Sequence, residues 1–432
     1  MESVWRKSVK MPRFAPLGGD IKTDVLVIGG GLAGILCAYR LSQAGVDCVL
    51  VEQGELCRGV TGNTTAKITA QHGLIYDKLL RQFGVEKARL YLEANLDALA
   101  RYRDLSRSID CDFEERDSFV YALNGRETLE RELEALARLG YGADFAEDLP
   151  LPLPAAGAVR FRKQAQFHPL KFASGISEGL KIFTHTKVRE LAPGRAMTDC
   201  GVISAQKIIV ATHFPMLNKH GCYFIKLYQH RSYVIALKGA PVPPGMYVDE
   251  AENGLSFREY GGLLLLGGGG HRTGKDGGGW NVLERFARRK FQKAQIVGRW
   301  ATQDCMTLDG VPYIGPYAKN TSGIYVATGF NKWGMTSAMA AANILTDLVQ
   351  GKENPYAKVF APHRTVMRPQ LAINIGESAF NLLTPTAPRC PHMGCALKYN
   401  RQEHSWDCPC HGSRFAEDGR LLDGPATDDK EM

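Results

Sequence analysis

The stretch Asp24-Val-Leu-Val-Ile-Gly29-Gly-Gly31-Leu-Ala-Gly34 decides the fold of the first part of this 432-residue chain. An apolar run typical of a buried parallel strand leads into spaced glycines, and a helical pattern follows. In dinucleotide-binding units, the first glycine turns the chain, the second lets the backbone approach a pyrophosphate, and the third lets helix and strand touch. The next strand ends on Glu52, which can accept hydrogen bonds from ribose hydroxyls. This order predicts a Rossmann-type α/β unit and disfavours a simple glycine turn.

Length and composition predict a globular protein of two or three domains. Apolar residues make up 44% of the chain and charged residues 23%, as in ordinary globular proteins. The net charge of +8 is scattered, so we expect no nucleic-acid partner. The first residues lack a signal-peptide pattern, and apolar runs such as Leu263 to Leu266 are far too short to span a bilayer. We therefore expect a cytoplasmic, soluble protein without a membrane partner.

Three later segments favour FAD over NAD as the bound nucleotide. Residues 207–212 form a strand that ends in a turn of small residues, and residues 309–315 precede a second glycine-containing turn at 329–336. A helix then begins and runs to Val349. Its first N–H groups and the positive end of its dipole suit the electron-rich carbonyl edge of a flavin.

From Asp24 to about Val349 the chain resembles the D-amino-acid oxidase superfamily of FAD-dependent oxidoreductases. The loop from Arg58 to Lys67 also resembles the stretch that lines pyrophosphate and flavin ring in that superfamily. The resemblance implies an FAD cofactor and FAD contacts from Gly29, Gly31, Gly34, Glu52, Thr61, Gly62, Val188, Ala211, Gly329, Gly334 and Thr336.

The remaining parts of residues 1–350 are expected to form a substrate domain, an inserted antiparallel sheet that roofs the flavin. We predict nucleotide-binding segments at about 22–75, 155–215 and 300–350, and a substrate domain at about 76–154 and 216–299. Within the latter, periodicity predicts helices at 85–107 and 127–139 and strands near 119–122, 231–237, 246–248 and 263–267.

The sequence assigns no catalytic residue, but three side chains are candidates. Lys67 and His72 follow the flavin loop, where a cation would stabilise a reduced, anionic flavin. We favour the alternative that Lys67 binds phosphate and that His72 is a satisfied buried imidazole. Arg231 would either clamp a substrate carboxylate or be a charge at a sheet edge. Further active-site candidates are Tyr76, His168, Tyr233, His271 and Trp333.

Two Cys-His motifs follow, Cys390-Pro-His392 and Cys408-Pro-Cys-His411. Thiolates on one iron and imidazoles on the other give a [2Fe-2S] centre of raised reduction potential. The alternative is a tetrahedral zinc site. The spacing and the Gly-Ser turn after His411 favour iron and sulfide.

Residues 386–432 resemble a Rieske [2Fe-2S] domain. The resemblance implies that Cys390 and Cys408 bind one iron and that His392 and His411 bind the other. It also matches Cys395 and Cys410 to the disulfide pair of respiratory Rieske proteins, although a free-thiol state stays open.

The Rieske-like part departs from the family because no strand pattern precedes it between Ala361 and Arg389. We expect the flavin domain to replace the missing base sheet and to fix the cluster at one distance from the flavin. Residues 351–385 would form a docking linker with one amphipathic helix. Its apolar positions, expected to pack on the flavin domain, are Leu371, Ile373, Ile375, Phe380 and Leu383.

Together the two resemblances imply an enzyme that oxidises a small amine or amino-acid-like substrate. FAD would take a hydride, the cluster would take electrons singly, and a soluble electron carrier would remove them. Two alternatives stay open. Electrons could run from cluster to FAD, or the cluster could be a structural or redox-sensing element.

Overall fold

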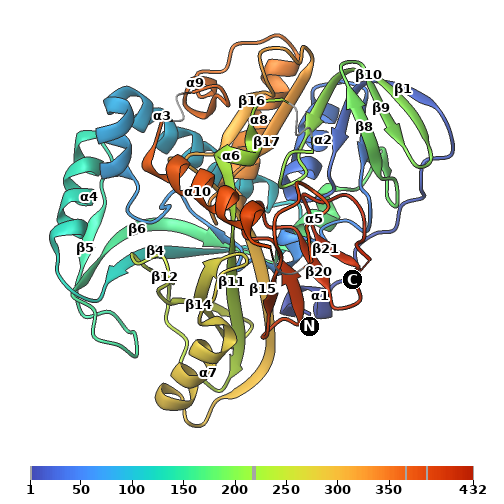
Figure 1. Cartoon of the computed structure of the whole chain (residues 1–432). Coiled ribbons are helices and arrows are strands. Elements are labelled where there is room, and N and C mark those ends of the chain that lie inside the picture. Colours follow the sequence, from blue (N-terminus) through green and yellow to red (C-terminus); the bar gives the residue numbers. More distant parts are fainter. Residues whose placement is uncertain (1, 217–219, 365–366, 386–387, 432) are drawn as a thin grey trace.

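The computed structural model describes residues 2–216, 220–364, 367–385 and 388–431, and the strands of these residues form three sheets (Figure 1). Eight strands form the first sheet, nine form the second and four form the third. The first sheet lies at the right of Figure 1, the second crosses its lower half, and the third belongs to the C-terminal module. The expected α/β class, with a Rossmann-type unit and a second large sheet, is confirmed.

The eight-stranded sheet has the order β16-β17-β10-β1-β2-β7; in addition β9 pairs with β10, and β8 pairs with β9. Strands β17, β10, β1 and β2 run parallel to one another. Residues 25–28 of β1 are buried, as expected for a parallel strand covered on both faces. The bounds are β1 Ile21–Ile28, β2 Cys48–Val51, β7 Ile182–Phe183, β8 Val188–Ala192, β9 Arg195–Thr198, β10 Gly201–Val210, β16 Tyr313–Pro316 and β17 Ile324–Thr328.

Two helices that begin at the glycine-containing turns pack against each other, α2 (Leu32–Gln43) and α8 (Gly334–Val349). In α8 the small side chains of Ala340, Ala341 and Ala342 are buried, which allows close packing. Shorter helical segments complete this part of the chain: α1 Val4–Ser8, η1 Val60–Asn63, α5 Pro169–Ile176 and α6 Tyr223–Lys226.

The nine-stranded sheet has the order β15-β11-β14-β13-β12-β4-β6-β3, with β5 beside β6. Neighbouring strands are antiparallel except β4 and β12, which pair in parallel. The strand bounds are β3 Lys67–Ile68, β4 Glu114–Ala122, β5 Asp144–Ala146, β6 Gly157–Gln166, β11 Leu227–Lys238, β12 Met246–Asp249, β13 Ser256–Tyr260, β14 Leu263–Arg272 and β15 Gln295–Thr307. The accompanying helices are α3 Tyr76–Leu105, α4 Glu127–Arg138 and α7 Gly279–Lys290.

The predicted helices and strands of this region are confirmed, but the segment boundaries differ from expectation. Strands β3, β6 and β15 join the nine-stranded sheet, although we predicted their residues within nucleotide-binding segments. The helix predicted at 85–107 begins earlier, at Tyr76, and Gly84 interrupts its helical geometry.

The C-terminal part consists of a helical linker and a small sheet. The linker contains α9 Ala357–Phe360 and α10 Pro369–Leu383, and the sheet order is β18-β19-β20-β21. Its strands are β18 Lys398–Asn400, β19 Ser405–Asp407, β20 Arg414–Ala416 and β21 Leu421–Asp423. Among the described residues of 361–389 there is no strand longer than a single bridge residue, as expected for a module without a base sheet.

Helix α10 is turned the opposite way from our prediction and crosses the front of the molecule in Figure 1. The side chains of Phe380 and Leu383 are 64% and 82% exposed, so the expected packing of this apolar face is wrong. The buried face is polar instead. Asn374 Nδ2 donates to the carbonyl oxygen of Ile225, and Asn381 is buried against the cluster module. None of the helices in the described ranges is both long and apolar enough to cross a bilayer.

Candidate functional site

The predicted FAD contacts gather where four parallel strands end. Gly29 follows β1, Glu52 follows β2, Ala211 follows β10 and Gly329 follows β17. Since these strands are parallel, their carboxyl ends share one edge of the sheet. Nucleotides bind outside this edge in open α/β sheets. Val188 also lies close, in the apolar cluster that contains Val51.

The glycine-rich turn has the geometry that a pyrophosphate needs. A Cβ on Gly34 would collide with the carbonyl oxygen of Gly29, so only glycine lets α2 lie this close to β1. A Cβ on Gly31 would instead meet open space, with Thr61 Oγ1 nearest at 3.5 Å. This open position at the first turn of α2 lets a phosphate reach the helix N–H groups.

Glu52 is held in place by backbone donors. Its carboxylate accepts hydrogen bonds from Gly30 N at 2.6 Å and from Gly54 N at 2.9 Å. Burial raises the pKa of this carboxyl group, and the backbone hydrogen bonds oppose that shift. A fixed carboxylate beside the glycine turn suits ribose hydroxyls.

Arg6 is a feature of this site that sequence reasoning missed. It lies on α1 beside Gly62, where a Cβ would come within 2.8 Å of Arg6 Nε. Thr61 Oγ1, one residue earlier, accepts a hydrogen bond from Leu32 N at the start of α2. The Nη2 group of Arg6 is buried and has no hydrogen-bond partner among the described residues. A buried guanidinium beside the pyrophosphate cradle fits a phosphate oxygen.

The side chain of His72 packs against the start of α8, where it contacts Thr336 and Trp333 of the predicted flavin site. Its Nε2 is 2.9 Å from Thr336 Oγ1, its Nδ1 is 2.7 Å from Tyr91 Oη, and its ring stacks on Trp333 with centroids 5.1 Å apart. Burial lowers the pKa of His72 to about 3, so the imidazole is neutral. This geometry favours our second interpretation, a satisfied buried imidazole. Tyr76 is likewise satisfied, with its hydroxyl donating to Ala70 O.

Lys67 begins β3 and is buried without a carboxylate partner in the described part of the chain. Its Nζ donates to Thr65 Oγ1 at 3.2 Å. Burial, and then the charge of Arg258, lower the pKa of Lys67 to about 7. Arg258 is itself fully buried and donates to the carbonyl oxygens of Thr65 and Phe167. The nine-stranded sheet therefore holds two buried cationic groups near the end of the flavin loop.

Four candidates from the sequence have hydrogen-bond partners within the chain. Arg231 forms two hydrogen bonds with the carboxylate of Glu403, which belongs to the C-terminal module. Tyr233 Oη donates to the same carboxylate at 2.9 Å and lies 2.9 Å from His271 Nε2. The substrate-clamp hypothesis for Arg231 is not supported, because its guanidinium is already paired within the chain. His168 contacts Ser8 Oγ at 2.8 Å and anchors α1.

The two Cys-His motifs form matching loops. Gly394 N donates to Cys390 O, and Gly412 N donates to Cys408 O, both at 2.9 Å. The loops bring the rings of His392 and His411 to 4.9 Å between centroids. The thiols of Cys390 and Cys408 interact directly, which raises the pKa of Cys390.

The ligand set fits the cluster chemistry. Neither ring nitrogen of His411 makes a well-aligned hydrogen bond, although the side chain is 2% exposed. Two thiols and two imidazoles in this pairing are the donor set of a Rieske [2Fe-2S] centre.

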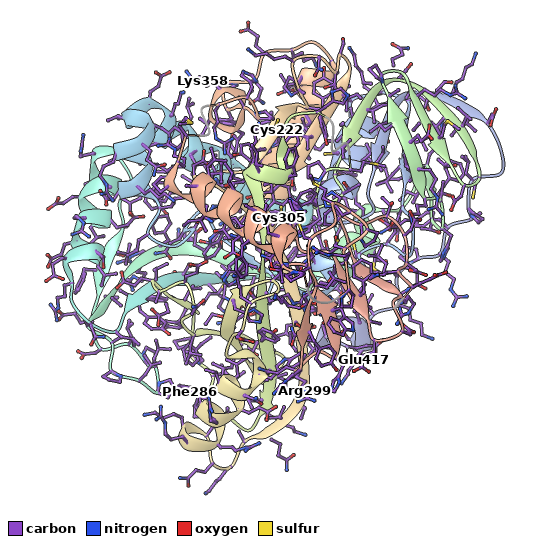
Figure 2. The ribbon with its side chains drawn as sticks, in the orientation of Figure 1. Cys222, Phe286, Arg299, Cys305, Lys358 and Glu417 are labelled. Atoms are coloured by element: carbon purple, nitrogen blue, oxygen red, sulfur yellow. The ribbon has the colours of Figure 1, made fainter. Side chains whose placement is uncertain are left out.

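The two additional cysteines of the module lie beside the predicted ligands. The Sγ atoms of Cys395, Cys408 and Cys410 all lie within 4.8 Å of one another. All eleven cysteines of the chain are unbridged in this structure. Cys305, near the centre of Figure 2, is far from this group in sequence and is buried against Thr328. A Cys395–Cys410 disulfide stays a prediction.

The C-terminal module and the flavin domain contact each other at glycines, where a side chain would collide with the opposite part. A Cβ on Gly274 would lie 2.6 Å from Pro409 N, and Gly274 has a φ of +73°. A Cβ on Gly412 would overlap Gln229, while Gln303 Nε2 donates to Gly412 O at 2.8 Å. These contacts and the Arg231–Glu403 pair support the expectation that the flavin domain serves as the base of the module.

An aromatic side chain joins the two sites. Ala211 O lies against Gly29 at the nucleotide edge, and Phe214 follows three residues later. The ring of Phe214 packs edge-on against both His392 and His411, with centroids 6.2 Å apart in each case. A short covalent segment therefore connects the FAD edge with the histidine side of the cluster.

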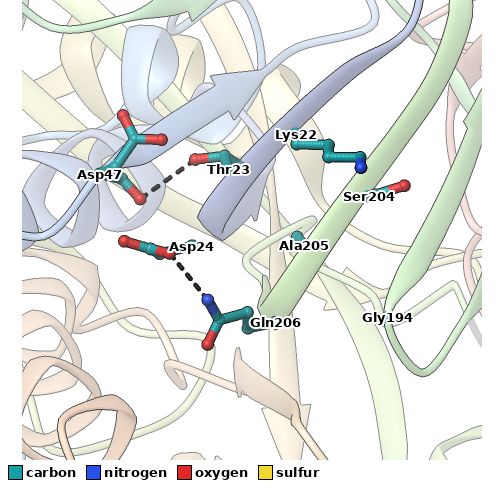
Figure 3. Close-up of a pocket in the computed structure, with 8 residues that line it drawn as sticks. All are labelled: Lys22, Thr23, Asp24, Asp47, Gly194, Ser204, Ala205 and Gln206. Atoms are coloured by element: carbon teal, nitrogen blue, oxygen red, sulfur yellow. Dashed lines mark hydrogen bonds between the residues drawn. The ribbon is translucent and has the colours of Figure 1, made fainter.

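A surface pocket of about 470 Å³ lies elsewhere (Figure 3). It is lined by residues such as Lys22, Asp24 and Ser204, near the amino ends of β1 and β10. In Figure 3, Gln206 Nε2 donates to Asp24 Oδ1. This is the end of the sheet opposite the glycine turn, and nucleotides bind at the carboxyl ends. The pocket is therefore not the FAD site.

Comparisons with known proteins agree with both sites. Residues 24–348 match the family described as FAD dependent oxidoreductase, and residues 370–431 match the Rieske [2Fe-2S] domain. A Bacillus subtilis (strain 168) protein named as a Rieske 2Fe-2S iron-sulfur protein, YhfW, is 35% identical and covers 98% of this chain and 96% of its own length.

Two further proteins are similar over the flavin domain. Gamma-glutamylputrescine oxidoreductase of Escherichia coli (strain K12) is 24% identical over 79% of this chain and 87% of its own. The crystal structure of glycine oxidase from Geobacillus kaustophilus superposes with a TM-score of 0.67 at 20% identity, covering 80% of this chain and 99% of that chain. The chain thus belongs to the FAD-dependent oxidoreductase family, binds FAD, and carries a Rieske [2Fe-2S] domain after its flavin domain.

Proposed function

We propose that the protein oxidises a small amine or amino-acid-like substrate at FAD and passes the electrons singly to its [2Fe-2S] cluster and on to an external soluble carrier. The observation that carries this proposal is the Ala211–Phe214 connection, which joins the nucleotide edge to the rings of both histidines. The names of the similar E. coli and Geobacillus proteins, which act on an amine and an amino acid, support the substrate class.

FAD supplies two-electron hydride acceptance, and the cluster supplies one-electron acceptance. The residues proposed to hold FAD are the strand-end and turn residues described above, with Glu52 at the ribose and Arg6 at the pyrophosphate. The proposed iron ligands are Cys390, His392, Cys408 and His411.

Lys67 is the residue we assign to charge stabilisation at the flavin end. It lies on β3 of the nine-stranded sheet, six residues after Thr61. In the described residues neither Lys67 nor Arg258 has a carboxylate within ion-pair distance, and the charges of Glu259 and Glu114 offset the burial of Arg258 only in part, so the positive charge here favours an anion nearby. A buried lysine with a pKa of about 7 also holds or releases a proton at physiological pH.

The test is an anaerobic rapid-mixing experiment on the holoenzyme. Amines and amino acids are first screened for those that bleach the flavin absorbance under nitrogen. With an active substrate, we expect flavin reduction first and cluster reduction second. A cluster that stays oxidised, or one that changes before the flavin, would contradict the proposed direction of electron flow.

A matched pair of variants tests the connection itself. Phe214→Leu should slow the second phase and leave the first unchanged, because the ring that packs on both histidines is lost. Phe286→Leu, on α7 at the lower edge of Figure 2, should change neither phase. Equal second-phase rates in both variants would exclude a role for Phe214.

A further inference from the structure

Arg272 reaches from the flavin domain to the second cluster loop. It is the last residue of β14, and its Nε donates to the carbonyl oxygen of Pro409 at 3.2 Å. Pro409 lies between the proposed ligand Cys408 and Cys410. The Nη1 group donates to Asn374 Oδ1 on α10 at 2.9 Å, and the guanidinium lies over the ring of Tyr228 at 5.0 Å.

The positive charge of Arg272 is not neutralised by a neighbour. No carboxylate lies within ion-pair distance of it in the described parts of the chain. Burial lowers the pKa of Arg272, and Glu377, whose charge opposes that shift most, is itself paired with Lys275 Nζ at 2.7 Å. Asn374 and Pro409 contribute neutral acceptors only.

One N–H group of this side chain is left over. The Nη2 atom is buried and has no hydrogen-bond partner among the residues described. Leaving a charged N–H donor unsatisfied is costly in a protein interior, so Nη2 favours an acceptor that the protein chain itself does not supply. The thiols of Cys408 and Cys410 are among the groups that interact electrostatically with Arg272.

We propose that Arg272 directs its charge and its unpaired N–H group toward the iron-sulfur cluster and thereby raises the cluster's reduction potential. Adding one electron makes the site more negative by one unit, and a fixed buried cation stabilises that state more than the oxidised one. The tuning residue therefore lies outside the Rieske-like module, in the domain that holds the flavin. It is a positioning and tuning residue, not a ligand.

This inference rests on the proposed cluster ligands, and the experiment separates the two. Arg272→Gln and Arg272→Lys are prepared as full-length holoenzymes. Iron content and the cluster's electron paramagnetic resonance spectrum report the ligand set. A redox titration then reports the cluster potential, with the FAD potential of the same sample as an internal reference.

In Arg272→Gln we expect the equilibrium constant for reduction of the cluster to fall at least tenfold. This corresponds to a reduction potential lower by about 59 mV for one electron, while the FAD potential stays constant. Arg272→Lys should keep most of the wild-type potential, because the charge remains. Arg420→Gln, which removes an exposed cation from the Rieske-like module itself, should have no effect.

Two results would overturn the proposal. One is an unchanged cluster potential in Arg272→Gln with full iron content. The other is a fall in Arg272→Lys as large as in Arg272→Gln, which would make the residue a packing element. If Arg272→Gln does not retain iron, Arg272→Lys still decides, since a potential far below wild type contradicts a charge effect. Absence of the expected electron paramagnetic resonance spectrum of the cluster in the wild-type protein would instead contradict the ligand assignment.

Discussion

Replacing Glu403 by glutamine should loosen the attachment of the cluster module to the flavin domain. The carboxylate is 9% exposed, accepts two hydrogen bonds from Arg231, one from Tyr233 and one from Arg414. The burial of Glu403 raises its pKa, but the charges and donors of its partners dominate and lower the pKa to about 2. Among the described residues, Arg231 would keep only the carboxylate of Asp423, 3.8 Å from its Nη1, as an acidic partner.

Two estimates of the stability lost in Glu403→Gln agree. A pKa lowered from 4.5 to about 2 corresponds to about 3 kcal/mol. Breaking a buried ion pair by removing one partner costs about 3–5 kcal/mol in other proteins. Because the folded-state pKa lies below the unfolded one, this stabilisation is complete above pH 4.5 and is lost as the pH falls through about 2. At pH 7 the variant therefore loses the full amount.

The assay is thermal loss of the cluster absorbance at pH 7, with proteolysis of the linker at residues 351–385 as a second measure. We expect cluster loss at a lower temperature and faster cleavage in Glu403→Gln. The control is Glu417→Gln, an acid of the same module at the edge of Figure 2 that is 59% exposed and bonds Tyr399 and His404. Surface pairs contribute about 0–1 kcal/mol, so the control should behave as wild type. Identical curves for both variants would refute the anchoring role of Glu403.

Three other substitutions test separate parts of the structure. Arg6→Ala should weaken FAD binding at least tenfold, because the unpaired guanidinium beside Gly62 is lost; equilibrium titration of the apoprotein by flavin fluorescence measures this, and unchanged affinity would contradict it. Gly274→Ala should lower the temperature of cluster loss, since a Cβ would meet Pro409 N at 2.6 Å and φ is +73°; a wild-type melting curve would show that the loop adjusts freely. Burial raises the pKa of Glu132 from 4.5 to about 7, so its contribution is present below pH 4.5 and is lost as the pH rises through 7. Glu132→Gln should therefore melt at a higher temperature than wild type at pH 8 and near wild type at pH 4.5, and an equal difference at both values would argue against this titration.

The parts of the fold that could be predicted are those that short sequence motifs and local periodicity specify. Gly34 must be glycine because a Cβ there would collide with the carbonyl oxygen of Gly29, only five residues earlier, so the glycine spacing identifies the turn without knowledge of the rest of the chain. The same holds for Cys390-Pro-His392, whose residues share one short loop. Alternating and helical periodicities located β4 and α4 for the same reason.

The errors concern residues whose partners are distant in sequence. Arg231 resembled a substrate clamp because its partner, Glu403, lies 172 residues away. The apolar side of α10 was expected inside, yet Asn374 faces the core because Arg272 and Ile225 supply its hydrogen-bond partners. Periodicity predicts that a helix has two faces; which face is buried depends on what it meets.

The contact between the cluster module and the flavin domain, which depends on glycines at 274 and 412, also constrains the order in which the protein folds and acquires its cluster. The loop around Pro409 takes its shape against Gly274 and Gln229 of the flavin domain, and the core of the module proper contains few buried apolar residues. A chain emerging from the ribosome completes this surface before residues 390–411 are made. We therefore expect iron and sulfide to enter loops that an already folded flavin domain has shaped, so that folding of that domain precedes cluster assembly.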